Sequence, residues 1–231
     1  MNLVKSTIYL SILIQVVALV IGVFAYNRKV PMKDMMLKDI LLIENVVQAV
    51  EFIFYLAIGF IITNIPTKHL AKYRYYDWAI TTPIMLLTTL LFFIYEDNKY
   101  NRNENDKEIL SAWDVIMREK RSIILFCLSN LGMLLMGFLQ ETNKLSIMIT
   151  NTIGFLFLFY SFYILNKYAK TETSRKLFWV MLVVWSLYGV VATFDPVMKN
   201  TSYNILDVIS KNFYGIFLAV LIYRLKTDDK K

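Results

Sequence analysis

The chain has 231 residues, of which 57% are hydrophobic and only 19% are charged, and its formal net charge is +7. The mean hydropathy is +0.49. A soluble domain of this length carries more charge, so the composition excludes that class and favours a membrane protein. The single cysteine, Cys127, lies in an apolar segment and cannot form a disulfide within the chain.

Seven apolar runs are long enough to cross a bilayer as helices, which takes about 18 residues or more. The first run has no basic N-terminal region of note and no obvious small-residue cleavage site, so we expect a retained helix and not a signal peptide. The runs predict an all-α membrane protein, in which residues 1–231 form a single domain, a seven-transmembrane helix bundle. They cover residues 7–26, 40–63, 73–95, 122–139, 145–166, 177–194 and 203–225.

The basic residues are unevenly distributed along this pattern. Of the 25 lysines and arginines, 18 lie in the segments that follow the first, third, fifth and seventh runs. Five lie in the N-terminus and the other loops, and two, Arg74 and Lys211, lie within helices. By the positive-inside rule, this asymmetry places the N-terminus outside and the C-terminus in the cytoplasm. It accounts for the net charge, so we expect no nucleic-acid partner.

The first two helices carry polar side chains at helical spacing. Ser11 and Gln15 lie one turn apart in the first helix, and Glu44, Gln48 and Glu51 share one face of the second. Glu44 and Glu51 are about 10 Å apart along that helix. Carboxylates and amides on neighbouring helices can bind a dehydrating cation and hold a file of water, which predicts an ion pathway. Hydrogen bonds between helices, or a proton relay, are the alternatives.

The third helix places Arg74, Asp77, Thr81 and Thr88 on one face, which must point into the bundle because lipid cannot solvate it. A charge at mid-bilayer costs about 2.5–3.5 kcal/mol, so ionisable residues in a span are functional candidates. The alternative is a buried Arg–Asp bridge that only holds helices together. Pro83 removes one helix hydrogen bond and predicts a kink.

The longest stretch that is not apolar links the third and fourth helices at residues 95–121. Its first half is polar and charged, and we expect it to be mobile. Its second half, from Ile109, has helical spacing, and we expect it to lie along the membrane surface.

The seventh helix places Lys211 one turn after Asp207, with Asn212 beside the lysine. A buried lysine with a lowered pKa could react with a carbonyl group to form a Schiff base. The alternative is a plain ion pair, which stabilises poorly in apolar surroundings because desolvation offsets the Coulomb attraction. Spacing alone leaves both interpretations open.

Four motifs, in the same order along the chain, resemble signatures of the microbial rhodopsins. The segment "RYYDWAITTP" at 74–83 resembles their third-helix signature, and "DVISKNFYG" at 207–215 resembles the seventh-helix signature with its retinal lysine. The segment "NLGMLLMG" at 130–137 matches the fourth-helix wall of the retinal pocket. The segment "WSLYG" at 185–189 matches the aromatic motif of the sixth helix, except that Gly189 stands where many members have proline.

This resemblance implies a site for covalently bound all-trans retinal. It implies that Lys211 carries retinal as a protonated Schiff base, that Asp77 and Asp207 are its counterions, and that Arg74 keeps both carboxylates ionised. Light would isomerise the retinal and move the Schiff-base proton relative to Asp77. The resemblance further implies that Tyr188 hydrogen-bonds the Asp207 carboxylate, that Thr81 hydrogen-bonds Asp77, and that a pocket for the polyene is formed by Trp78, Met133, Gly137, Trp185 and Tyr188.

The sequence favours a light-gated cation channel over a pump. Outward proton pumps of this family usually have an acid 11 residues after the third-helix aspartate, whereas this chain has Thr88, about 16 Å along the helix. Asp195 is the only candidate for an acidic release group in the last outside loop. An acidic second helix resembles the cation-conducting channelrhodopsins. One set of polar residues most resembles the group 1 viral rhodopsins of large DNA viruses: Ser11, Gln15, Glu44, Glu51 and Asn212. Members of that group are regarded as light-gated cation channels.

The runner-up function is a weak light-driven outward proton pump, and a third is a sensory rhodopsin that signals through a partner. A receptor or transporter without retinal would leave Lys211 unexplained. We expect an integral, multi-pass membrane protein, in a host-cell membrane if the chain is viral, that is not an enzyme and has no metal site. The expected partners are retinal, membrane lipid and monovalent or divalent cations or protons, with the oligomeric state left open.

Overall fold

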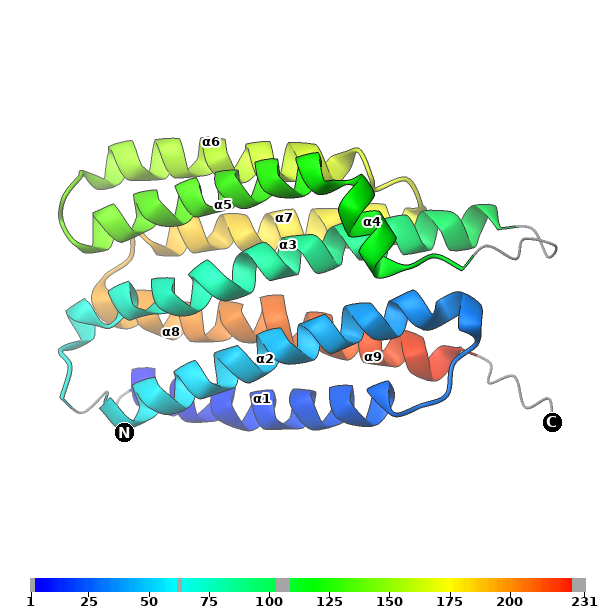
Figure 1. The fold of residues 1–231 in the computed structure, drawn as a ribbon. Helices are drawn as coiled ribbons and strands as arrows, with labels where there is room; N and C mark the ends of the chain where they lie inside the picture. Colours follow the sequence, from blue (N-terminus) through cyan, green and yellow to red (C-terminus); the bar gives the residue numbers. More distant parts are fainter. Residues whose placement is uncertain (1–2, 62–63, 103–108, 226–231) are drawn as a thin grey trace.

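The computed structural model describes residues 3–61, 64–102 and 109–225 (Figure 1). In this part of the chain, seven helical spans are long and apolar enough to cross a membrane, as the sequence predicts. The helices of these spans are α1 (Leu3–Tyr26), α2 (Met35–Ile61), α3 (Ala71–Asn101), α5 (Lys120–Glu141), α6 (Ile147–Asn166), α7 (Glu172–Val191), and the consecutive α8 (Pro196–Asp207), η3 (Val208–Asn212) and α9 (Phe213–Arg224). Three short helices lie outside or at the ends of these spans: η1 (Met32–Asp34), η2 (Thr67–His69) and α4 (Ala112–Arg118).

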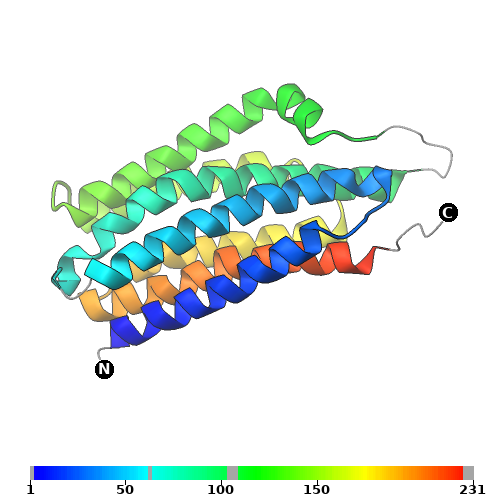
Figure 2. The ribbon, with the colours of Figure 1, turned by 60° about the horizontal axis from the view of Figure 1, so that its bottom comes forward.

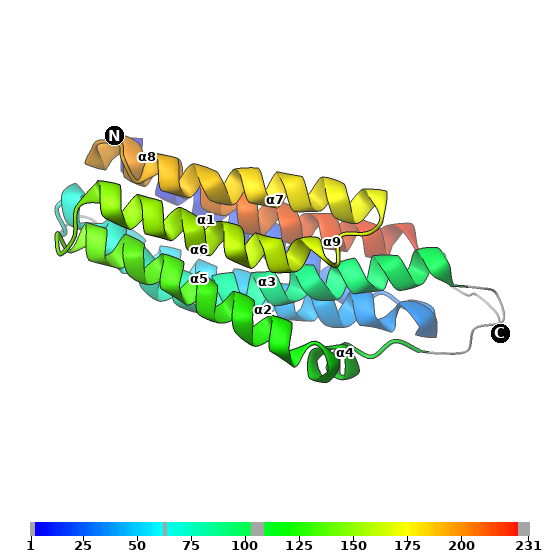
Figure 3. The ribbon, with the colours of Figure 1, turned by 90° about the horizontal axis from the view of Figure 1, so that it is seen from above.

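The spans run side by side along the long axis of the bundle, and the start of α1 and the end of α9 lie at opposite ends of it (Figures 1 and 2). The last span packs against α1 and α2, which brings the two terminal spans together. On the other side of the bundle, α5 lies beside α6, and α7 lies beside α6 (Figure 3). The third span, α3, contacts α2, α5 and α7 and so runs through the middle of the molecule.

The burial pattern is that of a bundle with a polar interior and an apolar surface. In α1, Ser11 is 2% exposed and Gln15 is fully buried, whereas Leu13 is 62% and Phe24 67% exposed. Water would not stabilise such an arrangement, but a hydrocarbon surrounding would, because it solvates the apolar side chains and forces polar groups inward. The fold is therefore that of a multi-pass integral membrane protein.

The helix ends differ from the sequence expectation mainly in the last span, which begins at Pro196 and not at residue 203. Asp195 caps it: its carboxylate accepts hydrogen bonds from the backbone N–H groups of Val197 and Met198, at 3.0 and 3.2 Å. Proline at the first helical position also favours this start. An apolar criterion misses the first turns because they are polar and lie where the helix leaves the hydrocarbon.

The proline of the third span does not interrupt it, since α3 continues through Pro83. The hydroxyl of Thr82, next to Pro83, donates a 2.7 Å hydrogen bond to the backbone carbonyl of Trp78. The polar half of the linker was expected to be mobile, but its first residues, 95–101, form the last turns of α3, and residues 103–108 lie outside the described residues. The helical expectation for its second half is confirmed by α4, which buries Ala112 and Val115 and exposes Trp113.

Candidate functional site

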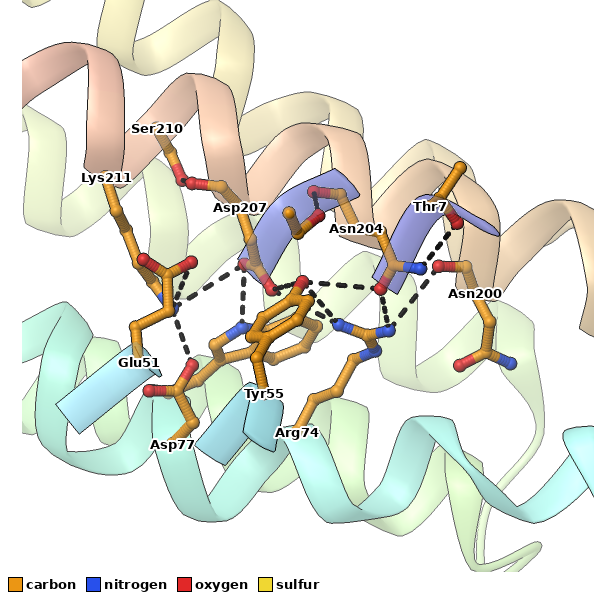
Figure 4. Close-up of polar contacts among 12 residues, drawn as sticks. Thr7, Glu51, Tyr55, Arg74, Asp77, Asn200, Asn204, Asp207, Ser210 and Lys211 are labelled. Atoms are coloured by element: carbon orange, nitrogen blue, oxygen red, sulfur yellow. Dashed lines mark hydrogen bonds and ion pairs between the residues drawn. The ribbon is translucent and has the colours of Figure 1, made fainter. Parts of the chain in front are cut away.

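Lys211 lies at the centre of the bundle, only 1% exposed, with three carboxylates around its ammonium group (Figure 4). Its Nζ donates a 2.5 Å hydrogen bond to Asp77 Oδ2 and lies 3.7 Å from Asp207 Oδ1 and 3.8 Å from Glu51 Oε1. The two expected partners, Asp77 and Asp207, are thus both in place. The proximity of Glu51 was not expected, because the sequence interpretation placed it only in an ion pathway.

The backbone that carries Lys211 is not α-helical. Residues Val208–Asn212 form the π-helical segment η3, between α8 and α9. A π turn holds one more residue than an α turn, and such turns occur frequently at functional sites. No sequence pattern predicts this segment, since its apolar spacing is compatible with a regular helix.

Arg74 forms a buried ion pair with Asp207 across the bundle, at 3.2 Å, and not with Asp77 of its own helix. A buried Arg–Asp bridge between helices, the alternative that the sequence left open, is therefore present, but Asp207 is the acid in it, and Asp77 pairs with Lys211 instead. The arginine also donates to Tyr55 Oη at 3.0 Å, to the carbonyl of Asn200 at 3.4 Å and to the side-chain oxygen of Asn204 (Figure 4). Sequence reasoning missed Tyr55, Asn200 and Asn204; the signal was their helical spacing from Glu51 and Asp207.

The Asp207 carboxylate is held by three further donors. Tyr188 Oη and Trp78 Nε1 donate to Oδ1 at 2.8 and 3.1 Å, and Tyr55 Oη donates to Oδ2 at 2.8 Å. Tyr188 therefore makes the expected contact. The hydroxyl of Thr81 contacts Asp77, but through the backbone carbonyl at 3.0 Å and not through the carboxylate. A threonine four residues later in a helix reaches that carbonyl readily, which leaves the carboxylate free to face Lys211.

An apolar cavity opens from Lys211 between α3, α5, α6 and α7. Trp78, Met133, Gly137, Trp185 and Tyr188, which the sequence placed in a retinal pocket, all line it. The sequence analysis did not name five further lining residues, among them two from α6: Thr82, Met85, Leu134, Phe155 and Leu158.

Two glycines let aromatic rings that line this cavity lie close to the helix backbone. A methyl group on Gly189 would lie 2.6 Å from the ring of Phe155, and one on Gly137 would collide with Tyr75. Gly189, the departure from the family motif, thus makes room for an aromatic ring. An apolar cavity with a buried amine at one end fits a long, conjugated carbonyl compound such as retinal.

The predicted ion-pathway residues form a buried polar line beside this cavity, all of them at most 2% exposed. Asn212 Nδ2 donates to Glu51 Oε2 at 3.1 Å, and Ser11 Oγ donates to the carbonyl of Asn204 at 3.2 Å. Several polar atoms in the line have no hydrogen-bond partner among the described residues: both amide atoms of Gln15 and Gln48, and one oxygen each of Glu44, Glu51 and Asn212. Buried polar atoms are normally paired, so this concentration of unpaired atoms requires an explanation.

Thr88, where outward pumps usually have an acid, donates a hydrogen bond to Glu44 of α2. The bundle therefore places a carboxyl group beside this level of α3, although α3 itself carries none. At the other end of the bundle, the Asp195 carboxylate caps α8, and Glu141 is paired with Lys199 at 2.8 Å.

Comparison with known proteins agrees with this geometry. A family model described as bacteriorhodopsin-like protein matches residues 4–225. The chain belongs to the bacteriorhodopsin-like family. Members of this family normally bind retinal in a membrane. No curated protein sequence gives a significant match.

Solved structures of microbial rhodopsins share the fold. The crystal structure of viral rhodopsin OLPVRII has a TM-score of 0.83 and 26% identity, and the match covers 96% of this chain and 99% of that one. Blue light-absorbing proteorhodopsin from Med12 has a TM-score of 0.72 at 19% identity, with 96% of each chain covered. The light-driven proton pump LR (Mac) from Leptosphaeria maculans has a TM-score of 0.67 at 17% identity, with 97% and 98% covered. The protein is a microbial rhodopsin related to viral rhodopsins.

Proposed function

We propose that this rhodopsin is a photoreceptor that works as a light-gated cation channel. The observation that supports the proposal most strongly is the line of fully buried polar side chains on α1, α2 and η3. It passes Lys211 and carries many polar atoms without a partner among the described residues. Such a line offers oxygen ligands and water sites to a cation, whereas a purely structural network would pair its own atoms.

In this proposal, Lys211 holds all-trans retinal as a protonated Schiff base, and Trp78, Thr81, Met133, Gly137, Trp185 and Tyr188 form or support the pocket. Bound there, retinal supplies light absorption and a light-driven change of shape. Asp77, at 2.5 Å, and Asp207, at 3.7 Å, balance the charge on the lysine nitrogen. Arg74 balances Asp207 in turn, so that two buried cations and the nearby carboxylates form one network.

The cation pathway runs through Ser11, Gln15, Glu44, Gln48, Glu51, Arg74 and Asn212. Glu51 lies where the pathway and the retinal site meet, because one of its oxygens bonds Asn212 and the other faces Lys211. A change of charge or position at the lysine therefore acts directly on a pathway carboxylate. The distribution of basic residues supports an N-terminus outside and a C-terminus in the cytoplasm. We place the whole chain in a membrane as one retinal-binding domain; this is a host-cell membrane if the protein is viral.

A second candidate is a light-driven outward proton pump, and the Glu44–Thr88 contact favours it. Glu44 could supply the proton that the threonine cannot, since it lies at the same level of the bundle. The pump then needs a single proton route, and the carboxyl group of Glu44 must exchange protons with the lysine nitrogen.

Voltage clamp separates the two functions. In cells that express the protein with retinal, a channel gives photocurrents that reverse sign when the cation gradient or the voltage is reversed. Glu51→Gln should reduce this current at least threefold or shift its reversal potential, and Glu51→Asp, which keeps the charge, should retain more of it. A photocurrent that stays outward at every voltage and gradient would refute the channel and establish the pump.

A further inference from the structure

Gln48 occupies a distinctive position in the polar line. It lies on α2 between the two acids of that helix, one turn after Glu44 and one turn before Glu51. Its side chain is fully buried, and neither amide atom has a hydrogen-bond partner among the described residues. Burying an unpaired amide is unfavourable, so packing stability alone does not explain a glutamine here.

The amide of Gln48 lies directly against Gly215 of α9. A methyl group built on Gly215 would collide with the amide nitrogen of Gln48 and lie 2.9 Å from its amide carbon. Glycine weakens a helix relative to alanine, so its presence four residues after Lys211 needs a reason. The reason here is that any larger residue would displace the Gln48 amide, which is enclosed on all sides.

Gly215 is mechanically connected to the lysine. It lies one turn after Lys211, at the start of the α-helix that follows the π segment η3. If a π turn tightens to an α turn, the helix after it rotates relative to the helix before it. A rearrangement around Lys211 therefore changes the surface that α9 presents to Gln48.

We propose that Gln48, seated on Gly215, is the constriction that closes the cation pathway in the dark, and that a movement at Lys211 opens it by shifting Gly215. This inference rests on the proposed channel function. The amide blocks the space between Glu44 and Glu51, so neither acid can pass a cation to the other while Gln48 stays in place. Release of the amide from Gly215 connects the two acids.

A double-mutant cycle tests the contact. Gly215→Ala forces the amide further into the pathway, and we expect the photocurrent to fall at least tenfold while the visible band is retained. Gln48→Ala removes the blocking amide, and we expect the permeability to methylammonium relative to Na⁺ to rise at least threefold. In the double variant the new methyl group has nothing to displace, so its photocurrent should lie within twofold of that of Gln48→Ala.

Thermal melting of the purified protein in the dark gives a second readout that does not depend on conduction. We expect Gly215→Ala to lower the melting temperature by about 5 °C, since overpacking destabilises a closed site, and to have no such effect when combined with Gln48→Ala. Gly59→Ala is the matched control, because its methyl group would meet only Ile12 and Ile8, at ordinary distances of 3.6 and 3.9 Å. It should change neither the current nor the melting temperature.

Two results would overturn the inference and can be told apart. If Gly215→Ala reduces the current by the same factor with and without Gln48→Ala, the contact does not control conduction, although the channel itself stands. If the wild-type photocurrent never reverses, there is no passive pathway to close, and the channel and its constriction fall together.

Discussion

The tyrosine at position 55 gives the sharpest quantitative prediction, because its hydroxyl group joins three elements of the network. Tyr55 Oη donates to Asp207 at 2.8 Å, accepts from Arg74 at 3.0 Å and lies 3.3 Å from Asn204. The ring is fully buried. Tyr55→Phe keeps the ring and removes only the hydroxyl group, so it measures the hydrogen bonds without creating a large cavity.

Two of these hydrogen bonds involve charged groups, which contribute about 1.5–3 kcal/mol each. Arg74 and Asp207 keep their direct contact, so we take the lower end for both bonds and expect a loss of about 3 kcal/mol. For a chain of this size, each kcal/mol corresponds to about 2–4 °C, so the melting temperature should fall by about 6–12 °C.

The assay is thermal melting of the purified, retinal-loaded protein in the dark, followed by the loss of its visible band. Tyr76→Phe is the control, because Tyr76 is also on the bundle but is 65% exposed, and it should change the melting temperature by less than 2 °C. A Tyr55→Phe protein that melts within 2 °C of the wild type would refute the view that α2 anchors the Arg74–Asp207 pair.

Three further predictions concern the retinal site and the pathway. Lys211→Ala should abolish the visible absorbance of protein purified with retinal, since it removes the only amine in the pocket lining; a retained band would refute retinal attachment there. Ser210→Ala should shift the absorption band to the red, because the Ser210 hydroxyl, 2.9 Å from Tyr188 Oη and next to Lys211, favours the ground-state charge distribution; a blue shift or no shift would contradict this. Glu44→Gln should lower the photocurrent severalfold or change the cation preference if Glu44 binds cations, and photocurrents of unchanged size and selectivity would remove Glu44 from the pathway.

Much of the site could be predicted from the sequence because it depends on positions within single helices. A spacing of four residues puts Asp207 and Lys211 on one face wherever that helix packs, and a lysine in an apolar span needs carboxylates nearby. The seven spans follow from apolar length alone, since a bilayer imposes the same requirement on every crossing segment. The motifs added the identity of the pocket residues, which spacing could not distinguish from ordinary helix packing.

The tertiary structure decided which faces of different helices meet. The sequence could not show that Glu51 of α2 comes within 3.8 Å of Lys211, or that Arg74 pairs with Asp207 rather than with Asp77, because both depend on the rotation and tilt of whole helices. The sequence also could not show that the backbone around Lys211 is π-helical, or that the Gln48 amide packs against Gly215. Helical spacing fixes which residues share a face, but only side-chain packing between helices fixes what that face contacts.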